Sequence, residues 1–153
     1  MRSLALLAVL TLCLGARAQE PAECVDPFIG TTNFGTTNPG AVTPHGMMSV
    51  VPFNVMGSEK NRFDKDSQWW STPYSADNKF FTGFAHGSLS GVGCPELGGL
   101  LLMPTTGELN VDYKAYGSEY KDEVAHPGYY SNTLTKYNIK AEATASMRTG
   151  LSR

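Results

Sequence analysis

The sequence predicts an all-β protein built as an antiparallel β-sandwich, and two observations support this fold class. Short apolar or alternating segments recur along the 153 residues, and 16 glycines and 9 prolines separate them. Beyond the N-terminal segment, no window longer than two turns keeps the helical period of apolar residues. We therefore expect one domain made of short strands and turns.

The first three expected strands are apolar runs with turn residues at their ends. Residues 47–51 are apolar apart from one serine, and they are entered through Pro44 and closed by Pro52. Residues 80–85 mix aromatic and small side chains. Residues 100–103 are continuously apolar, which is typical of a strand buried on both faces.

The last three expected strands show alternation of apolar and polar side chains. Residues 109–113 alternate after a Thr-Gly turn, and residues 129–135 alternate less cleanly. Residues 139–145 place one isoleucine and three alanines on one face, and Asn138 supplies the turn before them. Each of these strands should present one face to the core.

Two long connections join the expected strands. Residues 30–40 are rich in Gly, Thr and Asn and can form no strand of their own. Residues 54–78 are polar but contain Trp69, Trp70 and Tyr74. Loops of this length are usually functional or disordered, and aromatic side chains argue against disorder because they need burial or a ligand.

The N-terminal segment has the features of a secretory signal peptide. Arg2 provides the positive charge, residues 4–14 are an apolar run too short to span a bilayer, and residues 16–18 read A-R-A, a cleavage site. We expect residues 1–18 to be the signal peptide and residues 19–153 the mature domain. The product should then be secreted or periplasmic, with no membrane segment after cleavage.

Charge and cysteine content exclude some classes of partner. Arg2 and Arg17 leave with the signal peptide, so 10 of the 12 basic residues remain against 14 acidic ones. This balance argues against nucleic acid, which needs clustered Lys and Arg. Cys24 and Cys94 remain; a disulfide between them stays open, and two buried thiols are the favoured interpretation. No CxxC or HExxH spacing predicts a metal site.

A glycine-dense turn between two strands is the strongest candidate for a functional segment. Residues 81–104 read "FTGFAHGSLSGVGCPELGGLLLMP". Glycine lets the backbone take positive φ and approach a ligand closely, and a β-scaffold presents its sites on such connections. The alternative is a plain connection between two core strands, which composition alone favours.

This segment resembles the N-terminal domain of glycoside hydrolase family 92, the calcium-dependent exo-acting α-mannosidases. The resemblance rests on "GFAHGSLSGVGCPELGGLLLMPTTGEL" and on three further stretches in the same order as in the family. These read "VDPFIGT" at 25–31, "PGAVTPHGMMSVVP" at 39–52 and "HPGYYSNTLTKYNIKAEATA" at 126–145. His45 is a departure, because the family usually has Trp or Phe there.

The resemblance implies that the catalytic groups lie outside this chain. In the family, the sandwich leads into a large (α/α)6 domain that carries the acid, the base and most calcium ligands of an inverting mechanism. No pair of carboxylates here has a spacing that predicts such a site. We therefore expect an N-terminal fragment or truncated product whose sandwich is incomplete at the C-terminus. This fragment should have no catalytic activity of its own, and calcium should bind only in the intact enzyme. The alternative is a short, complete secreted β-domain.

The resemblance also implies a cleft between the two domains, where the sandwich would face mannose-containing glycans. Trp69 and Trp70 could stack on a sugar ring, or could be buried under their loop. His86 could hydrogen-bond a hydroxyl, although a lone His beside strand aromatics is more often a core residue. The turn residues could offer backbone N–H groups, or could need glycine only for their conformation. These turn residues are Ser90, Gly91, Gly93 and Cys94.

Two other function classes remain open from the sequence. A free-standing carbohydrate-binding module would use the same sandwich without a catalytic partner. An adhesion or structural β-domain would bind no sugar at all. The sequence downstream of Arg153 would distinguish these classes from the enzyme.

Overall fold

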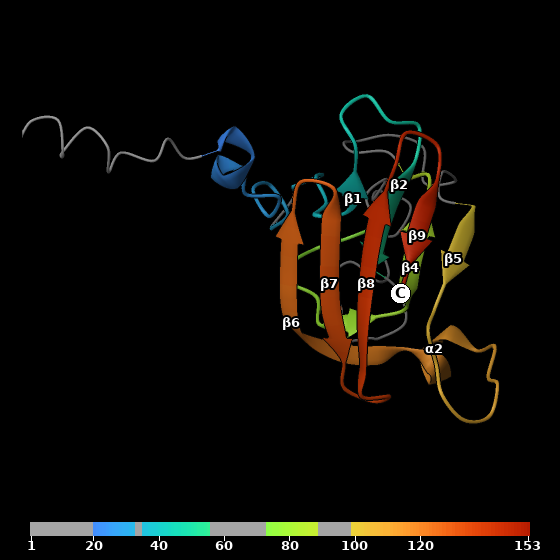
Figure 1. The fold of residues 1–153 in the computed structure, drawn as a ribbon. Helices are drawn as coiled ribbons and strands as arrows, with labels where there is room; N and C mark the ends of the chain where they lie inside the picture. Colours follow the sequence, from blue (N-terminus) through green and yellow to red (C-terminus); the bar gives the residue numbers. More distant parts are fainter. Residues whose placement is uncertain (1–19, 33–34, 56–72, 89–98) are drawn as a thin grey trace, which may run out of the picture.

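The structure, a computed structural model, describes residues 20–32, 35–55, 73–88 and 99–153. It consists of two antiparallel sheets packed face to face, so the predicted all-β sandwich is confirmed (Figure 1). The first sheet has the order β1 (Ala41–Val42), β2 (Ser49–Phe53), β4 (Gly83–His86) and β5 (Leu100–Leu102). The second has the order β3 (Phe80–Phe81), β6 (Ser118–His126), β7 (Tyr129–Leu134), β8 (Ile139–Ala145) and β9 (Gly150–Ser152).

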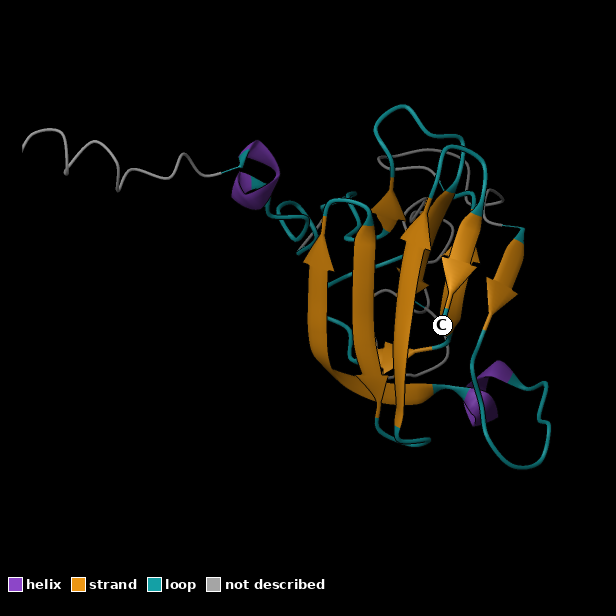
Figure 2. Cartoon of the chain, in the orientation of Figure 1, coloured by secondary structure: helices purple, strands orange, loops and turns teal. Residues whose placement is uncertain are grey.

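Two short helices lie outside the sheets, a 3₁₀-helix η1 (Pro21–Cys24) and the single turn α2 (Tyr113–Tyr116) (Figure 2). The expected signal peptide falls outside the described residues. No helix in the described part of the chain is long and apolar enough to cross a membrane. Cys24 in η1 is a free, exposed thiol, so the expectation of a buried thiol is wrong at this position; Cys94 is not described.

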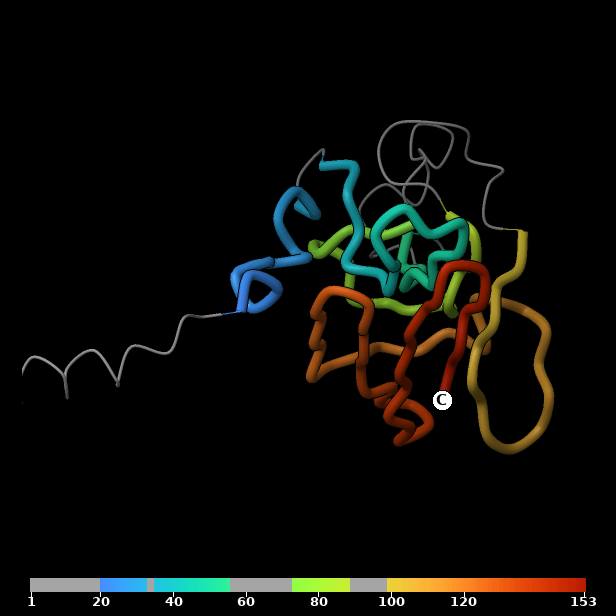
Figure 3. Tube along the Cα trace, turned by 45° about the horizontal axis from the view of Figure 1, so that its top comes forward, coloured from blue at the N-terminus to red at the C-terminus, as the bar shows by residue number. Residues whose placement is uncertain are grey.

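The core lies between the sheets, which appear as two separate layers in the turned view of Figure 3. Along β8 the burial alternates as predicted, with Ala141, Ala143 and Ala145 buried and the residues between them more exposed. These small side chains leave room for the larger groups of β4 and β7. Phe84 meets Tyr130 across the core in an edge-to-face contact with ring centroids 6.0 Å apart. The turn before β8 is also confirmed, because Asn138 has φ of 51°.

The expected strand at 80–85 is two strands in different sheets. The chain crosses between the sheets at Thr82, whose N–H donates to the Phe53 carbonyl at 2.9 Å. Gly83 follows with φ of 146°, and a Cβ there would lie 2.8 Å from the carbonyl oxygen of Leu102. As a result Phe81 and Phe84 face each other from opposite sheets, with centroids 5.1 Å apart.

Pro52 lies inside β2 rather than closing it. β1 pairs only with Ser49 and Val50, so the same side of β2 is a free edge further along. Phe53 directs its carbonyl towards Thr82, on the β4 side, and the neighbouring Pro52 therefore directs its missing N–H towards the free edge. The proline removes no bond from the ladder.

Two other expectations about strands are wrong. Residues 109–113 form no strand, because Asp112 caps α2 by accepting from the Lys114 N–H at 3.0 Å. The strand predicted to be buried on both faces, β5, lies at a sheet edge, and its three leucines are exposed. The longest strand, β6, was not expected at all, because its many charged residues hide its period.

Candidate functional site

Of the candidate residues from the sequence, His86 lies in the described part of the chain. The others fall outside the described residues, so the structure does not test them. These are Trp69, Trp70, Ser90, Gly91, Gly93 and Cys94. The site is therefore built here from His86 and the residues around the start of the glycine turn.

His86 ends β4 and is held by neighbours on both sides. It is in register with Val50 of β2 and Leu100 of β5, and it shares a sheet face with Phe84. Across the sandwich the ring packs against Gly150, where an added Cβ would lie 2.9 Å from the imidazole Cδ2. The residue is half-buried. Its Nδ1 is buried without a hydrogen-bond partner among the described residues.

The first residues of the glycine turn are fixed by Ser49. The Gly87 N–H donates to the Ser49 carbonyl at 3.0 Å, and the Ser49 hydroxyl donates to the Ser88 carbonyl at 2.7 Å. Gly87 has φ of 77° and open space where a Cβ would stand, so conformation and not close packing requires glycine here. The Ser88 hydroxyl is buried and has no partner within the described part of the structure.

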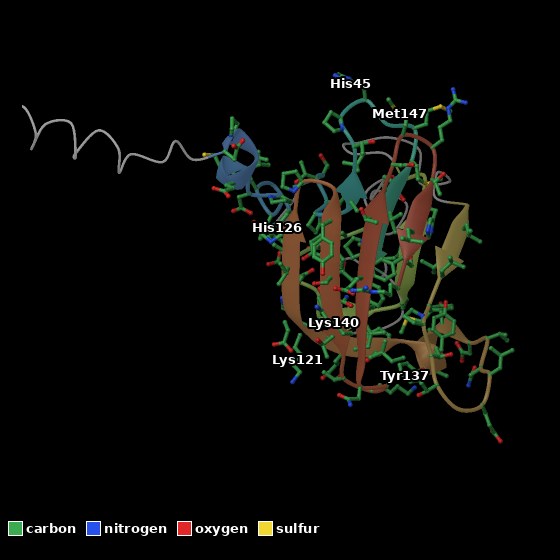
Figure 4. The ribbon with its side chains drawn as sticks, viewed as in Figure 1. His45, Lys121, His126, Tyr137, Lys140 and Met147 are labelled. Atoms are coloured by element: carbon green, nitrogen blue, oxygen red, sulfur yellow. The ribbon has the colours of Figure 1, made fainter. Side chains whose placement is uncertain are left out.

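Two more loops reach the same end of the sandwich. The Met47 N–H donates to the Met147 carbonyl at 2.8 Å, which joins the β1–β2 loop to the β8–β9 turn. His45 and Met147 lie on these neighbouring loops in Figure 4. His45 is exposed and has φ of 58°. These two loops and the start of the glycine turn thus lie at the end of the sandwich where His86 Nδ1 and the Ser88 hydroxyl have no partner among the described residues. Hydroxyl groups of a ligand could bond to both.

A buried polar cluster inside the sandwich was missed by sequence reasoning. Asn54, fully buried, donates from Nδ2 to the hydroxyl of Tyr120 at 2.8 Å and to the carbonyl of Ser75 at 2.8 Å. The Asn54 Oδ1 accepts from the Ser75 N–H at 2.8 Å. These bonds tie the segment after β2 to the opposite sheet. No local motif marks them, because the partners are far apart in the sequence.

A carboxylate joins the same cluster through a β-bulge. The register of β6 against β7 shifts between Lys121 and Val124, and this extra residue breaks the alternation of β6. Glu123 accepts hydrogen bonds from the hydroxyls of Tyr74 at 2.9 Å and Tyr130 at 2.6 Å. Burial raises the pKa of both tyrosines, and the nearby Glu123 charge raises it further. The two phenols are therefore fixed as donors, and the cluster is a structural element of the interior.

The described residues do not form a metal centre. No group of three or more His, Cys, Asp or Glu side chains within them could hold a metal ion. Calcium takes six to eight oxygen ligands, usually with several carboxylates. The described part of the chain therefore does not fit calcium by itself.

Solved structures with the same fold include family GH92 α-mannosidases. The family GH92 α-mannosidase BT3965 from Bacteroides thetaiotaomicron, solved in complex with mannoimidazole, is 30% identical over 88% of this chain, with a TM-score of 0.73. The GH92 family glycosyl hydrolase ccman5 is 29% identical over 87% of it, with a TM-score of 0.67. The inverting mannosidase BT2199 from the same Bacteroides species is 20% identical over 88%, with a TM-score of 0.61, and shows the fold alone. No curated protein sequence matches the chain.

The matched region is a small part of those enzymes. The chain covers 18% of the length of each of the three structures. The family model that matches it describes an N-terminal domain and extends over residues 24–153. The chain therefore belongs to the glycosyl hydrolase family 92 N-terminal domains.

Proposed function

We propose that the chain is the sugar-facing N-terminal domain of a secreted α-mannosidase that acts on mannose-containing glycans. The observation that carries the proposal is the 30% identity, over 88% of this chain, to an α-mannosidase that was solved with mannoimidazole bound. The family model supports the same assignment over residues 24–153. The fold alone would leave the function open.

The part of the site in this chain is the end of the sandwich around His86. Its buried Nδ1 and the buried Ser88 hydroxyl both lack partners in the described residues, and leaving such groups unpaired costs free energy. A mannose hydroxyl is both a donor and an acceptor, so it could bond to either group. The same proposal gives roles to the remaining candidate residues. The stacking surface would be Trp69 and Trp70. The backbone donors would come from the turn residues Ser90, Gly91, Gly93 and Cys94.

Catalysis and calcium binding belong, in this proposal, to the rest of the enzyme. The described residues do not fit calcium, and we derive no step that passes through it. An apolar surface supports the presence of a further domain. The three leucines of β5 are exposed, together with Leu109 at 86% and Val111 at 85%. Leu101, Leu109 and Val111 border a hollow of about 310 Å³ that Met103 and Tyr116 also line. Exposed apolar patches of this kind often mark interaction surfaces, and the proposed (α/α)6 domain of the same polypeptide would cover this one.

Secretion is part of the proposal and has its own test. Residues 1–18 would be removed as a signal peptide, so the mature protein would start at Gln19 and reach the periplasm or the medium. Intact-mass measurement of the secreted product should give the mass of a chain that starts at Gln19. A product that keeps Met1 and stays in the cytoplasm would contradict secretion, but it would leave the family assignment unchanged.

The test of the function uses the product of the complete gene. It should hydrolyse an α-mannobioside and lose activity when calcium is chelated, whereas the chain of residues 19–153 should have no activity. His86→Ala should lower kcat/KM without changing the thermal midpoint by more than a few degrees. Lys121→Ala, at an exposed residue near the opposite end of β6, is the control and should keep full activity.

The sequence leaves a free-standing carbohydrate-binding module as the alternative. A stop codon directly after Arg153 in the intact gene would favour it and would overturn the enzyme proposal. In that case the 19–153 chain alone should bind mannosides at the His86 end, and His86→Ala should weaken that binding.

A further inference from the structure

The outer face of the second sheet carries a row of three side chains with an unusual profile. The strand register places Tyr129 of β7 opposite Thr144 of β8, and Thr144 opposite Leu151 of β9. Opposite residues in antiparallel strands point to the same face. Tyr129 and Thr144 alternate with the buried Tyr130 and Ala143, so this row faces away from the core. A small residue thus stands between two large ones.

This profile forms a hollow of about 190 Å³ on the face of the sheet. Tyr129 and Leu151 are its walls, and Thr144 and the backbone around Ala143 are its floor. The Thr144 hydroxyl is already used, because it donates to the Gly128 carbonyl at 2.8 Å. Leu151 is 62% exposed although it is a large aliphatic residue. The hollow therefore presents apolar surface that the described chain does not cover.

One end of the hollow is polar, and the charged side chains there keep hydrogen-bond donors that a ligand could use. The Glu142 carboxylate accepts from the Tyr129 hydroxyl at 2.7 Å, from Lys140 at 3.1 Å and from the Arg153 Nε at 2.8 Å. These bonds hold its pKa at about 2, so the carboxylate is charged and engaged. Lys140 and Arg153 remain 64% and 84% exposed, and they keep donors that Glu142 does not use. Lys140 lies on this face in Figure 4.

We propose that this hollow binds one pyranose ring of a glycan. A pyranose has a flat face of C–H groups and a rim of hydroxyls. The C–H face matches the tyrosine ring and the leucine side chain, and the rim matches the donors of Arg153, which lines the hollow. The hollow lies on the outer side of the second sheet, whereas His86 faces the interior between the sheets. The proposal is therefore a separate site and does not depend on the mannosidase assignment.

His126 supports the role of Tyr129 as a platform. The two rings are stacked, with centroids 6.3 Å apart and an interplanar angle of 22°. The hydroxyl of Tyr129 is fixed by Glu142 at the same time. A ring held by both contacts loses little further freedom when a sugar binds, which lowers the entropic cost of binding.

The test uses the ¹⁵N-labelled 19–153 chain with Leu109→Ser and Val111→Ser, which keep it soluble and lie outside the hollow, and titrates it with methyl α-mannopyranoside while the amide shifts are followed by NMR. Signals of Thr144, Leu151 and Arg153 should move, with an affinity in the millimolar range. Mannitol is the matched ligand control, because it has the same hydroxyl chemistry but no ring. It should produce no shifts at these residues.

Two substitutions separate the site from general surface binding. Thr144→Leu fills the floor, and Leu151→Ser removes one wall; each should weaken binding at least about fivefold. Thr133→Leu is the matched control, since it makes the same change on the same face of β7 outside the hollow. It should bind as the wild type does. Equal shifts with mannitol, unchanged binding in both hollow variants, or no shifts at Thr144 and Leu151 would each overturn the proposal.

Discussion

Asn54 and Tyr120 join the two sheets of the sandwich by a buried hydrogen bond of 2.8 Å. Asn54 follows β2 of the first sheet, and Tyr120 lies on β6 of the second. The Tyr120 hydroxyl in turn donates to the carbonyl of Asn78 at 2.8 Å. The side chain of Asn54 thus connects, by hydrogen bonds, the segment after β2 and the strand β6, which do not pair with each other as strands.

Asn54→Ala should destabilise the protein by about 2–4 kcal/mol. The change leaves the Ser75 N–H without its acceptor and the Tyr120 hydroxyl without its donor, and each buried polar group left unpaired costs about 1–3 kcal/mol. Urea unfolding followed by fluorescence measures the difference. Asn110→Ala is the matched control, because Asn110 is exposed and accepts one bond, from Asp112. Equal losses for the two variants would show that the cluster contributes no special stability.

The buried tyrosines should titrate only far above their ordinary pKa of 10.0. Burial is the main cause for Tyr74, Tyr120 and Tyr130, and the Glu123 charge adds to it. Because the folded pKa is raised, this contribution to stability is complete below pH 10 and is lost as the pH rises further. An ultraviolet titration of the folded protein should show a late group of tyrosines that merges with the rest in urea. A single step near pH 10 in the folded state would contradict the cluster.

Glu142 should make stability depend on pH in the acid range. Its bonds from Tyr129, Arg153 and Lys140 lower its pKa from 4.5 to about 2. The stabilisation is therefore present above pH 4.5 and is lost as the pH falls towards 2. Between pH 5 and pH 3 the urea midpoint of Glu142→Gln should fall less than that of the wild type. Added salt should reduce the difference, because Lys140 and Arg153 are exposed. An equal fall in the urea midpoints of the two proteins between pH 5 and pH 3 would contradict the lowered pKa of Glu142.

Strands with clear alternation of apolar and polar residues could be predicted from the sequence. Strands whose bounds depend on contacts with distant segments could not. β8 places Ala141, Ala143 and Ala145 inward because a strand has a period of two, and this is visible in any such run. The division of residues 80–85 depends instead on Gly83, whose conformation reflects the close approach of β5. Contacts with a distant strand leave no local signal.

The site was predictable to a smaller degree than the fold. The glycine turn and His86 could be predicted as candidates because glycine and polar residues lie between two expected strands. The ring of His86 packs against Gly150, which is 64 positions later in the chain. The Glu123 cluster depends on a bulge in β6, and the hollow at Thr144 depends on the register of three strands. Both require pairing information that one sequence does not contain.

The exposed apolar surface beside β5 should limit solubility of the 19–153 chain. Leu109 and Val111 are almost fully exposed, and among the described strands β5 is an edge without a partner on its outer side, which invites association. Leu109→Ser combined with Val111→Ser should raise the soluble fraction and change stability by less than about 0.5 kcal/mol. Leu134→Ser, at a fully buried position, is the control and should unfold the domain. Light scattering and urea unfolding measure the two effects. Aggregation that persists in the double variant would locate its source elsewhere.

Gly150→Ala should disturb His86 from the opposite sheet. An added Cβ would lie 2.5 Å from Val50 Cγ2 and 2.9 Å from the His86 Cδ2, so the β2 side chain and the imidazole must both move. Overpacking of this kind costs about 1–3 kcal/mol. Gly99→Ala makes the same change where nothing lies within 4 Å, and it should be neutral or slightly stabilising. The imidazole signals of His86 should shift in the first variant alone. In the complete enzyme Gly150→Ala should also lower kcat/KM; unchanged imidazole signals and unchanged kinetics together would separate His86 from both Gly150 and the sugar site.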